Sequence, residues 1–267
     1  GNGTDTFTYT LKDADGDTSQ ANLVLQVHNN DDPVLITGLN GEGTDATVYE
    51  KNLGTGSSPD AAALTQTGTF TVTAADGLQS LSIGGLNVVA AGVASGVGQS
   101  LTTGLGNTLT ITGFNTATGV VTYSYTLNGA DTHPTGDGAN SLIEHFNVVA
   151  TDTEGSVSNA SLNVSVVDDV PTAINDSNLN IASESLLTLT GNVLTNDIQG
   201  ADRIPSGPIV GGTFVGTYGT LVLAVDGSYT YTLNPHDPSF IKLHDGGNGT
   251  DTFTYTLKDA DGDTSQA

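Results

Sequence analysis

The stretch FTYTLKDADGDTSQANLVLQV, Phe7–Val27, decides the fold because two runs of alternating apolar and polar residues flank an acidic turn. Alternation rich in Thr, Tyr, Val and Leu predicts β-strands, and the run DADGD between them predicts a hairpin turn. The stretch aligns without gaps on FNVVATDTEGSVSNASLNVSV, Phe146–Val166, and it begins again at Phe253. We therefore expect a hairpin of one kind to close each domain.

An identical repeat joins the two ends of the sequence. Residues Gly1–Ala21 recur without a substitution as Gly247–Ala267. Identity over this length is typical of a recently duplicated tandem array, so the sequence indicates about one period of a longer repetitive protein. This organisation favours an architectural function.

Short alternating segments continue along the whole chain, and none has a convincing helical periodicity. The expected strands are Thr69–Thr73, Leu109–Ile111, Val120–Leu127, Phe146–Ala150, Leu162–Val166, Leu221–Val225 and Tyr229–Leu233. Many short strands separated by Asp-Gly and Asn-Gly turns predict an all-β protein made of tandem antiparallel β-sandwiches in an elongated array.

Two acidic segments that end in proline predict the domain boundaries. HNNDDP, His28–Pro33, follows the first copy of the hairpin stretch, and VDDVP, Val167–Pro171, follows the second. We interpret both as interdomain linkers. Residues 1–32 are then the C-terminal hairpin of a preceding repeat, 33–169 a complete sandwich, and 170–267 a sandwich that lacks its last strand.

The composition excludes several classes of protein. Hydrophobic residues make up 36% and charged residues 13%, so the chain is too apolar for a disordered protein. Its net charge of −24 disfavours nucleic acid as a partner, and no apolar run is long enough for membrane insertion. Because there is no cysteine, a divalent cation held by carboxylates is the leading candidate for a stiffening element.

The acidic turns are the candidate cation sites. Asp13, Asp15 and Asp17 bring three carboxylates together around a glycine, at the close spacing that Ca²⁺ prefers. The third copy repeats them as Asp259, Asp261 and Asp263, and the middle copy keeps acids as Asp152 and Glu154. The alternative interpretation is a polar hairpin turn with solvated aspartates.

The sequence also resembles known families. The segments GNVLTNDIQGAD, Gly191–Asp202, and GTYGTLVLAVDGSYTYTLN, Gly216–Asn234, together with the repeated hairpin stretch, resemble the VCBS repeat, a cadherin-like or immunoglobulin-like sandwich. The middle region, with FTVTAADGLQSLSIGG and ATDTEGSVSNASLNVSVVDD, is similar to the longer repeats of type I-secreted RTX adhesins and biofilm-associated proteins. The resemblance implies a calcium-stiffened extender on the bacterial cell surface.

In cadherin-like modules, Ca²⁺ ligands come from the interdomain linker, from a Glu early in the following domain and from an acidic loop. The resemblance therefore implies Asp31, Asp32 and Glu50 as ligands at the first junction. At the second junction it implies Asp168, Asp169, Asp176 and Glu184. The acids Asp152 and Glu154 join either their own domain end or its neighbour.

Two functions remain open from the sequence. The first is a passive extender, and the second is a middle domain that binds a glycan or a protein through its long loops, 54–64 and 128–139. An enzyme is disfavoured because no metal-ligand histidine spacing and no nucleophile motif is present, so no catalytic residue is predicted.

We expect neighbouring repeats of the same chain as partners. A head-to-tail association is also expected, in which Asn22–Val27 of one molecule adds to residues 170–267 of another.

Overall fold

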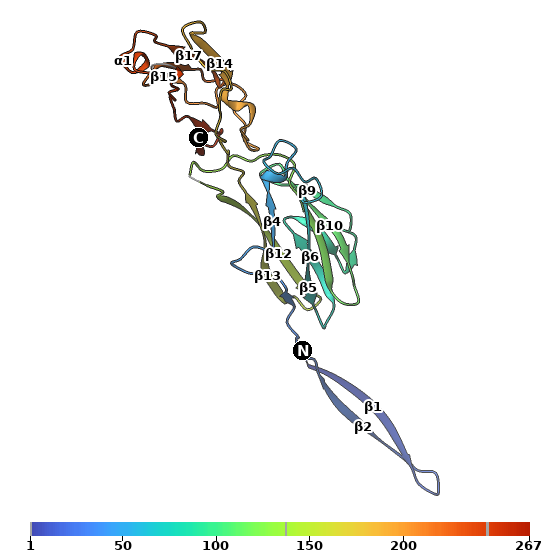
Figure 1. The fold of residues 1–267 in the computed structure, drawn as a ribbon. Helices are drawn as coiled ribbons and strands as arrows, with labels where there is room; N and C mark the ends of the chain where they lie inside the picture. The colour runs from blue at the N-terminus through green and yellow to red at the C-terminus, as the bar shows by residue number, and fades with distance from the viewer. Residues whose placement is uncertain (1, 137, 244–245) are drawn as a thin grey trace.

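The structure is a computed structural model that describes residues 2–136, 138–243 and 246–267. Figure 1 shows three parts that follow one another along a line: a projecting hairpin, a large sandwich and a smaller C-terminal part. Among the described residues, no helix has the length and apolar character needed to cross a membrane.

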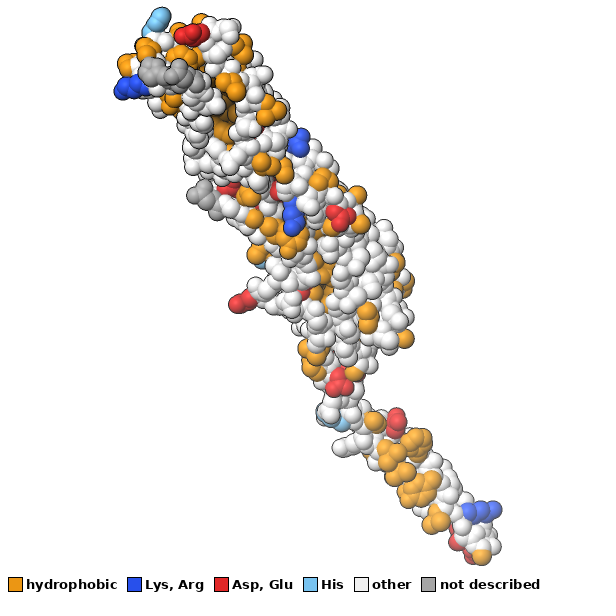
Figure 2. All heavy atoms as spheres, viewed as in Figure 1, with side chains coloured by type: hydrophobic (Ala, Val, Ile, Leu, Met, Phe, Trp, Pro, Cys, Tyr) orange, Lys and Arg blue, Asp and Glu red, His pale blue; other side chains and the backbone are white. Residues whose placement is uncertain are grey.

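The N-terminal part is a single antiparallel hairpin. Strand β1 (Asn2–Lys12) pairs with β2 (Thr18–His28) from Asn2↔His28 to Lys12↔Thr18. Every residue of both strands is exposed. Side chains alternate across a strand, so this register places Phe7 and its partner Leu23 on one face. Figure 2 shows apolar side chains gathered along the hairpin.

The middle part is a sandwich of two sheets. One sheet has the order β3-β5-β11-β10-β9, and the other has the order β4-β13-β12-β6-β7-β8. The first sheet consists of β3 (Leu35–Thr37), β5 (Thr65–Thr73), β9 (Ser100–Thr102), β10 (Thr108–Phe114) and β11 (Val120–Thr126). The second consists of β4 (Ala46–Tyr49), β6 (Leu78–Ile83), β7 (Leu86–Ala90), β8 (Val93–Ala94), β12 (Ser141–Asp152) and β13 (Val157–Val167). A 3₁₀ turn, η1 (Glu50–Asn52), follows β4.

Period-two alternation builds the core between these sheets. In β11, Val121, Tyr123 and Tyr125 are buried, while the residues between them are only partly covered. Full burial of one large apolar side chain contributes about 1.5–3 kcal/mol. Tyr123 packs over Gly68, where an added Cβ would lie 2.3 Å from the tyrosine hydroxyl, so only glycine fits.

One parallel pairing determines which end of the sandwich carries Glu50. Strand β4 runs parallel to β13, with Ala46 opposite Val164 and Tyr49 opposite Val167. The residue after β4 therefore lies beside the residue after β13. As a result, Glu50 and Asp168 come together at the C-terminal end of the sandwich.

The C-terminal part has a four-stranded sheet in the order β14-β17-β16-β15 and a separate two-stranded pair, β18-β19. Its elements are β14 (Thr188–Asn192), η2 (Val193–Thr195), β15 (Gly212–Val215), β16 (Gly219–Leu223), β17 (Ser228–Leu233), α1 (Pro238–Ile241), β18 (Thr256–Lys258) and β19 (Thr264–Gln266). Val193, Ile209, Leu223, Tyr255 and Leu257 form its small core. The predicted all-β sandwich architecture is confirmed, and each strand expected from the sequence overlaps an observed one.

A candidate metal-binding joint

The three acidic turns share one conformation. In each turn, Oδ1 of the first aspartate, Asp13, Asp152 or Asp259, accepts hydrogen bonds from the backbone N–H groups three and four residues later, at 2.8–2.9 Å. The glycine at the fourth place of each turn has a φ of 107°, 100° or 95°, which is a left-handed conformation that favours glycine. The first acid therefore orders the turn with one oxygen and leaves Oδ2 for another partner.

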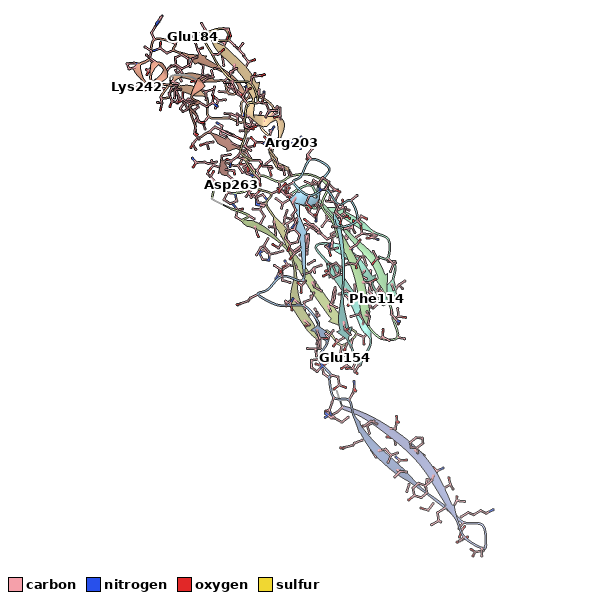
Figure 3. The ribbon with its side chains drawn as sticks, viewed as in Figure 1. Phe114, Glu154, Glu184, Arg203, Lys242 and Asp263 are labelled. Atoms are coloured by element: carbon pink, nitrogen blue, oxygen red, sulfur yellow. The ribbon has the colours of Figure 1, made fainter. Side chains whose placement is uncertain are left out.

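The turns differ in what surrounds them. Asp13, Asp15 and Asp17 group together at the exposed tip of the β1–β2 hairpin. The middle turn lies at the N-terminal end of the sandwich, next to the linker that precedes it. The third turn lies where the sandwich meets the C-terminal part, and Figure 3 shows Asp263 at this joint. Each of the last two turns therefore faces the region that precedes its own domain.

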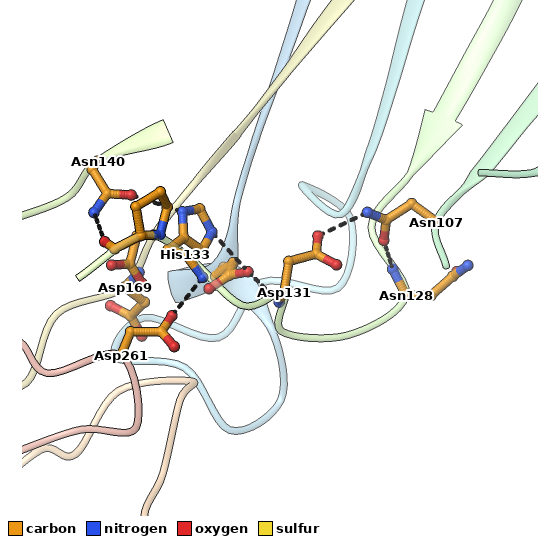
Figure 4. A network of polar contacts seen from close by, with 10 residues as sticks. Asn107, Asn128, Asp131, His133, Asn140, Asp169 and Asp261 are labelled. Carbon is orange, nitrogen blue, oxygen red and sulfur yellow. Dashed lines mark hydrogen bonds and ion pairs between the residues drawn. The ribbon is translucent and has the colours of Figure 1, made fainter. Parts of the chain in front are cut away.

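Direct hydrogen bonds connect the middle sandwich to the C-terminal part. The backbone N–H of His133 donates to Asp261 Oδ2 at 2.9 Å, and the N–H of Gly138 donates to Asp263 Oδ1 at 3.0 Å. Arg203 Nη2 donates to the Thr55 carbonyl at 2.9 Å. One loop of the sandwich thus holds the acidic turn of the C-terminal part, as Figure 4 shows for Asp261, and a second loop contacts Arg203.

A cluster of carboxylates is enclosed in this joint. Asp168, Asp202 and Asp261 bring one oxygen each within 4.8 Å of one another, and so do Glu50 and Asp168 with a nitrogen of His133. Glu50 is 0% exposed, and Asp168 is 4% exposed. Within the described ranges, five buried oxygens here have no hydrogen-bond partner: Glu50 Oε2, Asp168 Oδ2, Asp202 Oδ2, Asp259 Oδ2 and Asp263 Oδ2.

Enclosure raises the pKa values of Glu50, Asp168 and Asp202. Burial raises the pKa of Glu50 to about 7 and that of Asp202 to about 8, and in Asp202 contact with the Glu50 carboxyl is the second cause. Burial, followed by contact with the Asp263 carboxyl, raises the pKa of Asp168 to about 7. Each group resists ionisation because burial and neighbouring carboxyl groups disfavour its charged form.

A polar network extends the cluster into the sandwich (Figure 4). Glu50 Oε1 accepts from the backbone N–H of Asp131 at 2.6 Å, and it lies 3.3 Å from His133 Nε2. Asp131 Oδ2 accepts from Asn107 Nδ2 at 2.9 Å. This contact between His133 and Glu50 is an ion pair only when the imidazole is protonated.

A smaller acidic group lies at the other end of the sandwich. Asp31, Asp76 and Glu154 bring carboxylate oxygens within 4.8 Å of one another. Ser156 Oγ donates to Asp31 Oδ2 at 2.8 Å, and the backbone N–H of Asp32 donates to Asp76 Oδ2 at 2.9 Å. Asp31 and Glu154 are exposed, so this group is much more open than the larger cluster.

Several predicted ligands lie elsewhere than expected. Placing Glu50 at the first junction is wrong, because the parallel β4–β13 pairing carries it to the second. Asp169 adjoins the cluster, but Ser57 occupies both of its oxygens, through its N–H at 2.7 Å and its Oγ at 2.5 Å. The Asp32 carboxylate is not part of the group that contains Asp31.

Two candidates for the second junction lie outside it. Asp176 is 3.1 Å from the Tyr255 hydroxyl, which also contacts Asp197, so it belongs to the interior contacts of the C-terminal part. Glu184 is exposed, and Figure 3 shows it at the far end of this part from Asp263. Both follow the linker in sequence, but the chain leads them away from the joint.

Sequence reasoning missed Asp76, Asp131, His133 and Asp202. Asp202 ends the GNVLTNDIQGAD segment, so an acid in a recognised motif was the available signal. Asp131 and His133 come from a long loop without regular spacing. Only the fold brings that loop to the joint.

Comparisons with known proteins complete the description. No curated protein matches this chain. Among solved structures, it is similar to the SrpA adhesin from Streptococcus sanguinis, with 13% identity, a TM-score of 0.32 and coverage of 90% of this chain and 92% of that one. It is also similar to extracellular cadherin domains 3–6 of protocadherin gamma B2, with 12% identity, a TM-score of 0.33 and coverage of 98% and 56%. Residues 168–267 match the family of bacterial cadherin-like domains, and this part of the chain is therefore similar to that family.

Proposed function

We propose that the protein is a calcium-stiffened extender segment of a large bacterial surface adhesin, and that the joint between residues 33–169 and 170–267 is its principal Ca²⁺ site. One observation carries this proposal. Buried carboxylates from both sides of the joint converge and leave five oxygens without a partner among the described residues.

The cluster needs positive charge. Two carboxylates about 5 Å apart repel each other by about 3 kcal/mol at an effective dielectric constant near 20. Glu50, Asp168, Asp202, Asp259, Asp261 and Asp263 all contribute to the joint. Arg203 directs its Nε and Nη2 to backbone carbonyls, so its hydrogen bonds do not serve these acids. A bound divalent cation would remove the repulsion.

The donor set fits Ca²⁺. This ion takes six to eight oxygen ligands, and carboxylates that approach from several directions suit its flexible coordination. The free Oδ2 of Asp259 and Asp263 comes from one side of the joint, and the free oxygens of Glu50 and Asp168 come from the other. Bound Ca²⁺ would therefore tie the two regions together and limit bending.

The smaller group of Asp31, Asp76 and Glu154 supports a second, weaker site at the other end of the sandwich. Asp152, whose Oδ2 is buried and without a partner in the described chain, lies in the same turn as Glu154. The tip of the β1–β2 hairpin carries the same kind of acidic turn, so it would supply the ligands on one side of a similar site. Another domain of the array would supply the other half.

The long loops favour an extender over a ligand-binding module. Loop 54–64 supplies Ser57 to Asp169 and the Thr55 carbonyl to Arg203. Loop 128–139 supplies His133 and Gly138 to the acidic turn. Both loops are thus used by the joint itself, so the surfaces on which a glycan-binding function was predicted have a structural use.

The finer identity of the array is also a proposal. The match to bacterial cadherin-like domains supports a cadherin-like repeat, and the resemblance of Gly191–Asp202 and the hairpin stretch favours the VCBS type. The middle region favours a type I-secreted RTX adhesin involved in cell adhesion or biofilm formation. The protein would then act outside the cell, on the bacterial surface, as a non-enzymatic spacer.

Thermal unfolding in millimolar calcium and in chelator tests the metal site. We expect a clear rise in Tm with calcium, since binding to the folded state alone stabilises it by about 2.7 kcal/mol at 100-fold above Kd. Asp202→Asn should remove much of this rise because it removes a carboxylate ligand, and above about pH 8, where Asp202 ionises, it should also stabilise the chelated protein because it removes one repelling charge. Equal Tm values of the unsubstituted protein in both conditions would reject the proposal.

A further inference from the structure

A histidine side chain lies within the carboxylate cluster, although an all-oxygen calcium site would not take a histidine nitrogen as a ligand. His133 is 4% exposed, and its Nε2 is 3.3 Å from Glu50 Oε1. Imidazole nitrogen suits first-row transition ions, whereas Ca²⁺ binds oxygen ligands. The joint therefore contains two donor sets of different chemistry, which meet at Asp168.

Hydrogen bonding determines the orientation of the ring. Asn140 Nδ2 donates to the Pro134 carbonyl at 2.9 Å, so Asn140 presents Oδ1 to His133 Nδ1, also at 2.9 Å. His133 Nδ1 is then the donor, and in the neutral ring Nε2 carries a lone pair. Hydrogen bonding of the second ring nitrogen to an oxygen is the usual way in which a metal-binding histidine is oriented.

The lone pair of Nε2 meets other acceptors. Glu50 Oε1 already accepts from the Asp131 N–H, and Glu50 Oε2 and Asp168 Oδ2 are buried without a partner in the described residues. Three acceptor groups that face one another require a proton or a cation between them. One imidazolium proton bonds to a single acceptor, whereas a metal ion uses all three groups.

We propose that Glu50, His133 and Asp168 form a mixed nitrogen–oxygen site for a divalent first-row transition ion of the Zn²⁺ or Mn²⁺ class, next to the calcium compartment of Asp168, Asp202 and Asp261. This inference rests on the proposed calcium joint, because Asp168 belongs to both donor sets. The joint would then hold two kinds of cation, and a transition ion would occupy the side nearer the sandwich.

Cobalt titration of the calcium-saturated, tag-free protein tests this assignment, with Co²⁺ as the probe. We expect binding of one equivalent, visible absorption bands typical of nitrogen and oxygen ligation, and paramagnetic shifts of the His133 ring protons. Zn²⁺ should displace the probe. Calcium saturation keeps the all-oxygen compartment filled, so Co²⁺ reports on the mixed site.

Variants separate this site from other histidines. His133→Gln should abolish high-affinity Co²⁺ binding, and Asn140→Ala should weaken it by about 10–100-fold because the ring loses its orientation. His145→Gln is the matched control, since His145 Nδ1 also contacts an asparagine, Asn163, at 2.8 Å, but the ring is not part of an acidic group. This control should bind Co²⁺ as the unsubstituted protein does.

The outcomes distinguish the two proposals. A calcium-induced rise in Tm that persists in His133→Gln, together with lost Co²⁺ binding, supports both. A preserved calcium effect with no Co²⁺ binding, or with binding that is unchanged in His133→Gln, overturns the mixed site and leaves the calcium joint intact. If His133→Gln does not fold, absence of paramagnetic shifts at His133 in the unsubstituted protein overturns the mixed site.

Discussion

Residues 2–21 and 248–267 have one sequence and opposite surroundings. Tyr9 is 56% exposed and Leu11 69%, whereas their counterparts Tyr255 and Leu257 are 7% and 0% exposed. The buried copy packs against Ile209 and Leu223 of the C-terminal part. The exposed copy pairs only with the rest of its own hairpin.

The same contrast holds for the acids. Asp251 accepts from the backbone N–H of Thr217 and from the Tyr231 hydroxyl, at 2.6 and 2.7 Å, while its counterpart Asp5 is exposed. Asp259 and Asp263 are buried in the joint, while Asp13 and Asp17 lie in solvent. The local turn is identical in both copies, so the hairpin sequence determines the turn, and the neighbouring domain determines whether its carboxylates are enclosed.

The largest expected difference between the two copies concerns the contribution of their apolar side chains to stability. Leu257→Ala should destabilise the C-terminal part by about 2–5 kcal/mol, the usual cost of truncating a buried leucine. The matched change in the exposed copy, Leu11→Ala, should alter the free energy of unfolding by less than about 0.5 kcal/mol. Urea unfolding followed by tyrosine fluorescence measures both. Similar losses for the two variants would show that the exposed copy is packed in solution.

The acidic turns should differ next most strongly. Asp261→Asn with Asp263→Asn retains oxygens that can accept from His133 and Gly138, yet removes two negative charges from the joint. We expect this variant to lose about 2–3 kcal/mol of calcium-induced stabilisation. Asp15→Asn with Asp17→Asn, the same change in the other copy, should leave the calcium-induced rise in Tm unchanged. A larger loss of calcium-induced stabilisation in Asp15→Asn with Asp17→Asn than in Asp261→Asn with Asp263→Asn would contradict this expectation.

The joint should also make stability depend on pH. The pKa of Glu50 is about 7 and that of Asp202 about 8 in the folded protein, above the usual values of 4.5 and 3.8. Between about pH 5 and about pH 8, the folded state therefore holds protons that the unfolded state has lost, and stability falls as pH rises. In chelator, Tm should decrease over this range.

Calcium should reduce this pH dependence, because a bound cation replaces the protons on the cluster. The rise in Tm that calcium causes should therefore be greater at about pH 8 than at about pH 5. Differential scanning calorimetry at both pH values, with and without chelator, measures the effect. A Tm in chelator that increases toward pH 8 would show that these carboxyls are not buried as described.

The smallest effect we expect is self-association through the exposed copy. Phe7, Tyr9, Leu11, Leu23 and Leu25 are exposed on one face of the hairpin, and the counterparts of Tyr9 and Leu11, Tyr255 and Leu257, pack into the C-terminal part. We propose that a second copy of the chain covers this face head to tail, with Asn22–Val27 added to its C-terminal part. The net charge of −24 opposes the contact, so moderate salt should favour it.

Analytical ultracentrifugation over a range of concentrations measures this association. Leu23→Glu should abolish it, while Thr6→Glu, on the opposite face of the hairpin, should not. Strictly monomeric behaviour of the unsubstituted protein at high concentration and moderate salt would rule out the contact.

The sequence predicted the parts of the structure that depend on local pattern. Alternation in Val120–Leu127 predicted a strand, in which the structure buries Tyr123 and Tyr125, and the acidic run around a glycine predicted a hairpin turn. It also predicted Asp168, Asp261 and Asp263 as ligand candidates. These residues belong to short acidic motifs, in which residues close together in the sequence are also close together in space.

The remainder of the site depends on pairing between distant segments. Glu50 was assigned to the wrong end because the direction of β4 relative to β13 is not encoded in either strand alone. His133 and Asp131 lie in an irregular loop, and Asp202 reaches the cluster through the packing of two domains. Only half of the carboxylate cluster at this joint could therefore be predicted from the sequence, since one side lies in a repeat motif and the other side is assembled by the fold.

Small-angle X-ray scattering of the unsubstituted protein in millimolar calcium and in chelator measures directly whether calcium fixes the angle between residues 33–169 and 170–267. We expect a longer maximum dimension and a stiffer, rod-like profile in calcium, because a cation bound between Asp168 and Asp261 would fix the angle between the two regions. In chelator we expect a shorter and more flexible particle. Superimposable profiles in the two conditions would contradict the claim that calcium stiffens this joint.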